Sequence, residues 1–151
     1  MKLFAKCLFF LILFGCNSDE NNPVADEEVI VVIDDDPNHI RILALGDSYT
    51  SGHNVCDTCG FPEQLTDSLR LNLNPNYTYN LEVIAQLGLT TNNLLTLIDW
   101  ESPDNNNYVV TLFICVNNQY QNILFRTFFE EFPRLVDKAI LLAKNDPSNV
   151  I

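Results

Sequence analysis

Three polar clusters each follow a short apolar run, and together they could carry out acyl-transfer chemistry. The clusters are Gly46-Asp47-Ser48, Gln86-Leu87-Gly88 and Val116-Asn117-Asn118. A serine hydroxyl becomes a nucleophile when a base activates it, and amide groups can stabilise the oxyanion that forms on the attacked carbonyl. We therefore treat Ser48 as the candidate nucleophile, and Gly88 and Asn117 as candidate oxyanion donors.

Each of these residues has a plainer explanation when it is considered alone. A serine after a strand often caps a helix, and a single glycine often marks a tight turn. Asparagines in loops commonly satisfy backbone groups. The functional interpretation depends on the order of the clusters and on their shared position at the ends of strands.

Alternating strands and helices are expected to position these clusters. Apolar runs predict strands at 40–45, 79–86 and 108–115, and a further strand begins at 149–151. Helices are predicted from Pro62, from a cap at Thr90 or Thr91, and from Phe128, with Pro133 marking a kink or a late start. This order predicts an α/β fold, a three-layer, doubly wound and mostly parallel sheet. Parallel strands bring their carboxyl ends to one edge, so the three clusters should converge.

The three clusters resemble the ordered sequence blocks of the SGNH hydrolases, also called GDSL esterases and lipases. Gly46-Asp47-Ser48 matches the first block, Gly88 the second and Asn117 the third, where Cys115 stands in place of a glycine and Asn118 in place of an aspartate. The match covers residues 40–151. The resemblance implies hydrolysis of carboxylic esters such as acetylated sugars, lipids or acyl thioesters, through acyl transfer to Ser48. It implies no metal and no organic cofactor.

The catalytic base and its orienting acid are missing from this pattern. Members of the family carry Asp-x-x-His near the carboxyl end, whereas this chain ends at Ile151 and holds only His39 and His53. His39 precedes the first predicted strand, and His53, five residues after Ser48, is better explained as a solvated loop residue than as a base. We therefore expect a domain truncated at its carboxyl end and inactive as it stands. The alternative is a non-catalytic surface binding module or a pseudogene fragment.

The amino-terminal segment is typical of a bacterial lipoprotein signal. Lys2 and Lys6 precede an apolar run at 8–14 that is too short to span a bilayer, and Leu13-Phe14-Gly15-Cys16 resembles a lipobox. The resemblance implies cleavage after residue 15, a lipid on Cys16, and anchoring in the bacterial cell envelope at the outer membrane or cell surface. An ordinary secretory signal or a buried segment is the alternative.

Composition divides the remainder of the chain and limits its partners. Residues 16–38 are expected to form an acidic tether interrupted by a short edge strand at 29–33, and residues 39–151 the hydrolase-like domain. A net charge of −12 argues against binding to nucleic acid or to anionic membrane surfaces. Removal of residues 1–15 would make the charge more negative still.

The cysteines that follow the tether are Cys56, Cys59 and Cys115. No second ligand pair accompanies the CxxC unit formed by Cys56 and Cys59, so a zinc site is disfavoured. A local disulfide is the preferred interpretation outside the cytoplasm. Cys115 lies in an apolar run and is predicted to be a small buried residue.

Overall fold

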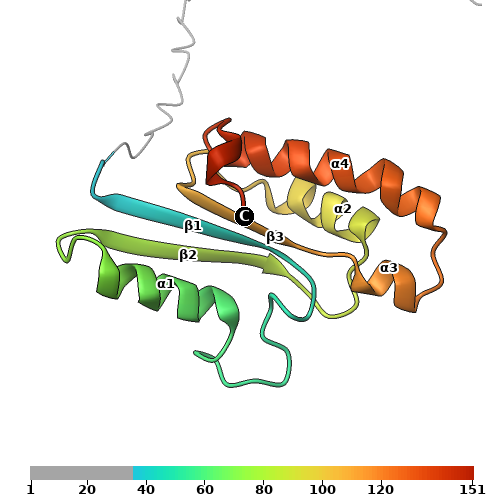
Figure 1. Ribbon diagram of the computed structural model, residues 1–151, viewed down its shortest axis with the longest axis horizontal. Coiled ribbons are helices and arrows are strands. Elements are labelled where there is room, and N and C mark those ends of the chain that lie inside the picture. The colour runs from blue at the N-terminus through green and yellow to red at the C-terminus, as the bar shows by residue number, and fades with distance from the viewer. Residues whose placement is uncertain (1–35) are drawn as a thin grey trace, which may run out of the picture. The chain divides into compact units, whose positions relative to one another are not determined.

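The computed structural model describes residues 36–151, which form a three-stranded parallel sheet with helices on both faces (Figure 1). The elements are β1 (His39–Gly46), α1 (Phe61–Asn72), β2 (Thr78–Ala85), α2 (Thr91–Glu101), β3 (Val109–Phe113), α3 (Val116–Tyr120), α4 (Phe125–Leu142) and a 3₁₀ turn, η1 (Pro147–Asn149). The predicted doubly wound α/β class is confirmed. The predicted signal peptide, Cys16 and the edge strand at 29–33 lie outside the described residues, as does most of the tether.

The strands lie in the order β2-β1-β3, and both pairings are parallel. Gly46, the last residue of β1, pairs with Ala85 of β2 and with Phe113 of β3. The three strands therefore finish at the same level. Their carboxyl ends form the single edge that the sequence pattern predicts.

The central strand β1 is almost wholly apolar because helices cover both of its faces. Helix α1 lies on one side of the sheet, and α2 and α4 lie together on the other (Figure 1). Leu43, Leu45 and Val110 are fully buried beneath α2 and α4. The remaining core comes from these residues: Ile84, Leu94, Leu95, Ile98, Ile114, Leu135, Ala139, Leu142 and Ala143.

Helix α2 starts where the sequence predicts. Thr90 is its N-cap, and the Thr90 hydroxyl accepts a hydrogen bond from the Asn93 amide at 3.4 Å. The predicted core positions Leu94, Leu95 and Ile98 are all buried. The cap and the apolar face therefore agree in placing α2 against the sheet.

Two predictions about the third strand and the residues after it were wrong. Strand β3 ends at Phe113 rather than Cys115, and a short helix, α3, follows it. Cys115 is consequently exposed rather than buried, because it precedes α3 at the edge of the sheet instead of lying in the strand. A helix of five residues is too short to show a repeat of apolar positions, so the sequence pattern could not reveal α3.

Helix α4 begins at Phe125, three residues before the predicted start, and continues through Pro133. Pro133 donates no backbone hydrogen bond to the carbonyl four residues earlier, which belongs to Phe129. Both residues are exposed, so water can solvate that carbonyl. The late start predicted from Pro133 is therefore wrong.

The last described residues pair with the free edge of β3, as the pattern at 149–151 predicts. The Ile151 amide donates to the Val110 carbonyl at 2.9 Å, and the Leu112 amide donates to the Ile151 carbonyl at 2.9 Å. Val150 forms a parallel bridge with Val110. These contacts extend the parallel sheet beyond β3.

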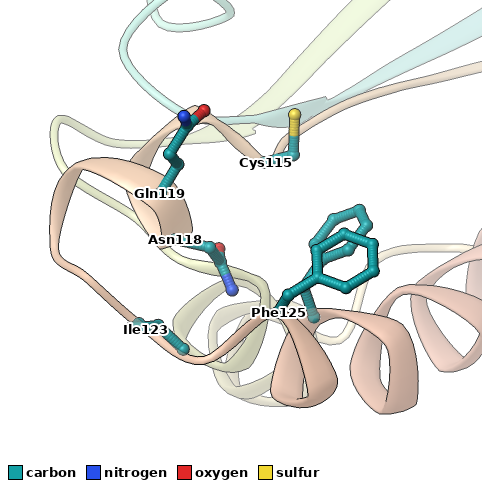
Figure 2. Close-up of a pocket in the computed structure, with 6 residues that line it drawn as sticks. Cys115, Asn118, Gln119, Ile123 and Phe125 are labelled. Carbon is teal, nitrogen blue, oxygen red and sulfur yellow. The ribbon is translucent and has the colours of Figure 1, made fainter.

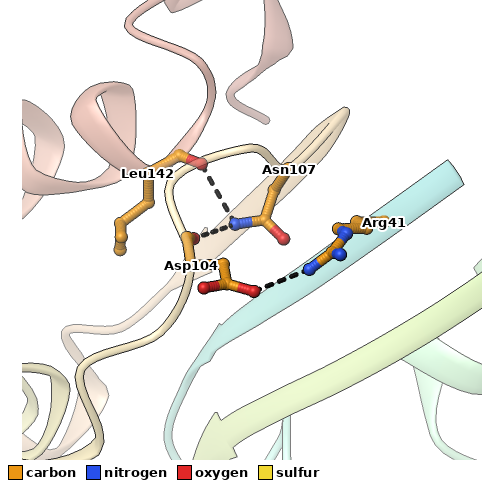
Figure 3. A network of polar contacts seen from close by, with 4 residues as sticks. All are labelled: Arg41, Asp104, Asn107 and Leu142. Atoms are coloured by element: carbon orange, nitrogen blue, oxygen red, sulfur yellow. Dashed lines mark hydrogen bonds and ion pairs between the residues drawn. The ribbon is translucent and has the colours of Figure 1, made fainter. Parts of the chain in front are cut away.

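A polar network fixes the amino-terminal side of the sheet (Figure 3). Arg41 on β1 pairs with Asp104 at 2.7 Å. The side-chain amide of Asn107 donates to the carbonyls of Asp104 and Leu142 at 2.7 and 3.0 Å. The α2–β3 connection is thereby tied to β1 and to the end of α4, at the opposite end from the candidate site.

Candidate active site

The turn after β1 begins with a glycine because the neighbouring strand comes close. A Cβ atom at Gly46 would lie 2.5 Å from the Phe113 carbonyl oxygen and would also collide with the Thr50 side chain. Any larger residue would push β3 away from β1. Gly46 therefore allows the ends of β1 and β3 to approach each other.

Asp47 organises the turn that presents Ser48. Its side chain is only 2% exposed, and one carboxylate oxygen accepts a hydrogen bond from the Tyr49 amide at 3.0 Å. The Asp47 carbonyl accepts from the amides of Thr50 and Ser51 at 3.1 and 2.9 Å. Ser48 itself is half-buried, and within residues 36–151 its hydroxyl makes no hydrogen bond. The turn is thus held by its neighbours, while the Ser48 hydroxyl is left available.

The side chain of Asn117 joins the three strand ends. Its Nδ2 atom donates to the Leu89 carbonyl, after β2, at 3.0 Å and to the Asp47 carboxylate, after β1, at 3.3 Å. Asn117 lies in α3, directly after β3. The structure therefore brings together the three clusters that the sequence pattern selects. Both amide hydrogens are engaged, so Asn117 would donate to an oxyanion by releasing the longer contact, the one to Asp47.

Gly88 occupies a left-handed turn between β2 and α2, with φ of +80°. Its carbonyl accepts a hydrogen bond from the Gln121 side chain at 2.8 Å. In the described part of the chain its amide donates no hydrogen bond, and a Cβ atom there would meet nothing within 4 Å. The positive φ is the reason for a glycine here, and the amide remains free as a donor.

Sequence reasoning missed the role of Asn118. This side chain is buried, its oxygen accepts from the Thr91 amide at 3.0 Å, and its nitrogen donates to the Thr91 hydroxyl at 2.7 Å. The Thr91 hydroxyl in turn donates to Glu131 on α4. An ionised aspartate could only accept, so the asparagine is what allows the Thr91 hydroxyl to accept from residue 118 while it donates its own hydrogen to Glu131. Asn118 therefore fixes α3 against α2.

A cavity of about 340 Å³ opens beside Ser48. His53 and Cys59 also line it, and the His53 amide donates to the Ser48 carbonyl at 3.0 Å. Among residues 36–151, the His53 ring makes no hydrogen bond to Ser48. His39 lies at the other end of β1, where its ring contacts the Thr78 hydroxyl at 2.9 Å. Neither histidine is placed as a base in this geometry.

The loop that walls this cavity is closed by a disulfide between Cys56 and Cys59. The Cys59 amide also donates to the Cys56 carbonyl at 2.8 Å, and the Gln64 side chain donates to the Cys59 carbonyl at 2.8 Å. The disulfide loop is therefore attached to the first turns of α1. This attachment holds Cys59 against the cavity that contains Ser48.

In residues 36–151, no cluster of three or more His, Cys, Asp or Glu side chains is arranged to hold a metal ion. Over the same range, no helix has the length and apolar character needed to cross a bilayer.

Comparison with solved structures supports the fold. The esterase AlinE4, described as an SGNH-hydrolase family esterase, superposes with a TM-score of 0.57 at 18% identity, over 66% of this chain and 52% of AlinE4. A lipolytic G-D-S-L family protein from Veillonella parvula superposes with a TM-score of 0.53 at 20% identity, over 71% of this chain and 54% of that protein. The lipase Lip_vut3 from a goat rumen metagenome superposes with a TM-score of 0.54 at 21% identity, over 69% of this chain and 57% of the lipase.

These similarities show that the described residues have the SGNH-hydrolase fold. The aligned region spans only about half the length of each of these structures. No protein-family model matches the sequence, and no curated protein matches it either.

Proposed function

We propose that this chain carries the nucleophile and oxyanion half of a serine ester hydrolase of SGNH type. The observation that supports it most is the pair of Asn117 contacts, to Leu89 at 3.0 Å and to Asp47 at 3.3 Å. These contacts hold the turn of Ser48 and the turn of Gly88 at one edge of the sheet. The esterase and lipase folds that it resembles favour the same chemistry.

In the proposed reaction the Ser48 oxygen attacks the carbonyl carbon of an ester. The hydroxyl proton passes to a base, and the carbonyl oxygen becomes an oxyanion that accepts from the amides of Ser48 and Gly88 and from Asn117. Collapse of this intermediate breaks the bond to the alcohol oxygen, which leaves with a proton. Water then attacks the acyl-serine, and the acid leaves as Ser48 recovers its proton.

The described residues place no catalytic base beside Ser48. No imidazole bonds to Ser48 within residues 36–151. Without a base the Ser48 hydroxyl stays protonated at neutral pH and is a poor nucleophile. We therefore expect the 151-residue chain to hydrolyse p-nitrophenyl acetate little faster than its Ser48→Ala variant, with Ser51→Ala as the matched control.

A second experiment supplies the base by fusing a segment that contains Asp-x-x-His to the carboxyl end of the 151-residue chain. We expect it to produce hydrolysis that Ser48→Ala abolishes and Ser51→Ala leaves intact. Strong Ser48-dependent activity without that segment would contradict the proposal of a missing base, and loss of that activity in His53→Ala would assign the base to His53.

A non-catalytic binding module is the second candidate, and the unpartnered Ser48 hydroxyl favours it. Such a module would bind carbonyl compounds without turning them over, whatever segment is added. Ligand-observed NMR with a non-hydrolysable ester analogue separates the two functions. Binding with no turnover, even when Asp-x-x-His is supplied, would support the module and exclude the hydrolase.

We further propose that a lipid on Cys16 anchors the protein in the bacterial cell envelope. The support for this is the sequence Leu13-Phe14-Gly15-Cys16. Inhibition of lipoprotein signal peptidase, or the variant Cys16→Ala, should leave the unprocessed form in the cell. Mass spectrometry that finds a mature amino terminus without acyl chains would refute the anchor.

A further inference from the structure

Three neighbouring cavities lie in a row at the carboxyl edge of the sheet, and we refer to this row as the track. The cavity of about 340 Å³ that contains Ser48 shares Tyr49 with a neighbouring cavity of about 220 Å³. This second cavity, lined in part by Asp47, shares Cys115 with a third of about 450 Å³. Tyr49 and Cys115 are therefore the two junctions between Ser48 and the far end of the track.

The third cavity is apolar and lies between α3 and the first turns of α4. Its lining residues are Cys115, Asn118, Gln119, Ile123, Phe125 and Phe128. Figure 2 shows the labelled residues around one hollow, with Phe125 at the start of α4 on one side and Asn118 and Gln119 across from it. No charged side chain lines the hollow, so a charged group would lose its hydration there without compensation.

The aromatic wall is held in place by neighbouring rings. The Phe128 ring stacks on Phe132 with centroids 5.1 Å apart, and it lies 6.0 Å from the Phe125 ring. Such pairs stabilise one arrangement of the rings beyond the effect of burying their surface. A wall fixed in this way is suited to a flat apolar ligand group, because little side-chain freedom is left to lose on binding.

We infer that the track binds a carbonyl compound whose apolar, preferentially aromatic, substituent occupies the cavity of Phe125 and Phe128. The placement of its carbonyl group near Ser48 rests on the proposed function. Cys115 stands where the substituent passes from the second cavity to the third, two residues before Asn117. It is therefore a specificity-determining residue that limits the width of the substituent.

Alkylation of Cys115 tests this inference without any need for turnover. Among residues 36–151, Cys115 is the free cysteine, and it is exposed. Its rate of reaction with iodoacetamide can be followed by peptide mass spectrometry on the 151-residue chain. We expect phenylacetate, which mimics the acyl side of an ester, or benzyl alcohol, which mimics the alcohol side, to slow this reaction. The more protective of the two identifies the side that enters the cavity.

Two phenylalanines on α4 provide a matched pair of variants. Phe125 lines the cavity and is 73% exposed, while Phe129 does not line it and is 70% exposed. The loss of either ring should leave folding intact. The Phe129 ring lies 6.1 Å from the Phe125 ring, so Phe129→Ala controls for the loss of that contact. We expect Phe125→Ala to weaken protection about tenfold, and Phe129→Ala to retain most of it. Acetate, which lacks a substituent, should give no protection in any variant.

The outcomes separate this inference from the proposed function. Protection that persists in Ser48→Ala, is lost in Phe125→Ala and is kept in Phe129→Ala supports the aromatic subsite, even if no ester is hydrolysed. Absence of protection by both aromatic compounds, or equal protection in Phe125→Ala and wild type, overturns it. Ser48-dependent hydrolysis together with either of those results would leave the proposed function standing while the subsite fails.

Discussion

Replacement of Asn117 by alanine should loosen all three strand ends at once. The variant removes the donor to the Leu89 carbonyl at 3.0 Å and the donor to the Asp47 carboxylate at 3.3 Å. A lost hydrogen bond costs about 1 kcal/mol when both groups are neutral and about 2 kcal/mol when one is charged. Since Asp47 is only 2% exposed, water cannot readily replace Asn117, and we expect a total loss of about 3 kcal/mol in the free energy of unfolding.

Urea unfolding of the 151-residue chain, followed by circular dichroism, measures this loss. Asn92→Ala is the control, because Asn92 is an exposed asparagine whose amide donates to Glu131 at 3.2 Å. It should change the free energy of unfolding by no more than about 0.5 kcal/mol. Equal losses in the two variants would show that the Asn117 contacts are not made in solution, and the convergence of the three clusters would lose its main support.

Asn117→Asp provides a second arm with a characteristic pH dependence. It places a carboxylate beside the buried side chain of Asp47, and the like charge raises the pKa of the introduced carboxyl group above its unfolded value. The folded state then binds more protons than the unfolded state, so stability falls as pH rises through the raised pKa. Asn117→Ala introduces no charge and lacks this repulsion, so its loss of stability at neutral pH should be smaller than that of Asn117→Asp.

Two further predictions concern the disulfide and Glu82. Replacement of Cys56 and Cys59 by serine should lower the free energy of unfolding by about 2 kcal/mol, the chain-entropy value for so short a loop, and wild type in excess dithiothreitol should match the double variant. Glu82 is exposed, and partial loss of hydration, followed by the charges of Asp104 and Glu101, raises its pKa, against a lowering by Arg41. Glu82 therefore destabilises the fold as pH rises from its unfolded to its folded pKa, so Glu82→Gln should be the more stable protein at neutral pH but not below pH ~4. Equal stability at both pH values would refute that assignment.

The regular elements were predictable because their signals are local. The apolar run of β1 and the cap at Thr90 are each contained in a few consecutive residues, and both predict the observed elements. Alternation of strands and helices then allowed few topologies other than a parallel sheet. The same reasoning places Ser48, Gly88 and Asn117 at one edge of the sheet.

What the sequence could not reveal depends on contacts between distant residues. Asn117 reaches Asp47 across 70 positions and Leu89 across 28. The bonds of Asn118 to Thr91 cross 27 positions. They give a structural role to Asn118, which the sequence comparison identified only as a residue in place of an aspartate. The exposure of Cys115 follows from the early end of β3, which is set by the turn into α3 rather than by composition.

The contacts of Asp47 and Asn117 explain how the proposed oxyanion half of the site could form without a base. Both Asp47 carboxylate oxygens accept hydrogen bonds, one from Tyr49 and one from Asn117, so this acid supports the turn and does not orient a histidine. The donors are thus fixed by contacts that lie wholly within residues 36–151. Oxyanion donors that are held in this way retain part of their effect when a catalytic base is removed. In the proposed function the site would bind the carbonyl group of an ester when Asn117 exchanges its longer contact, the one to Asp47, for the carbonyl oxygen, and a base would then add turnover.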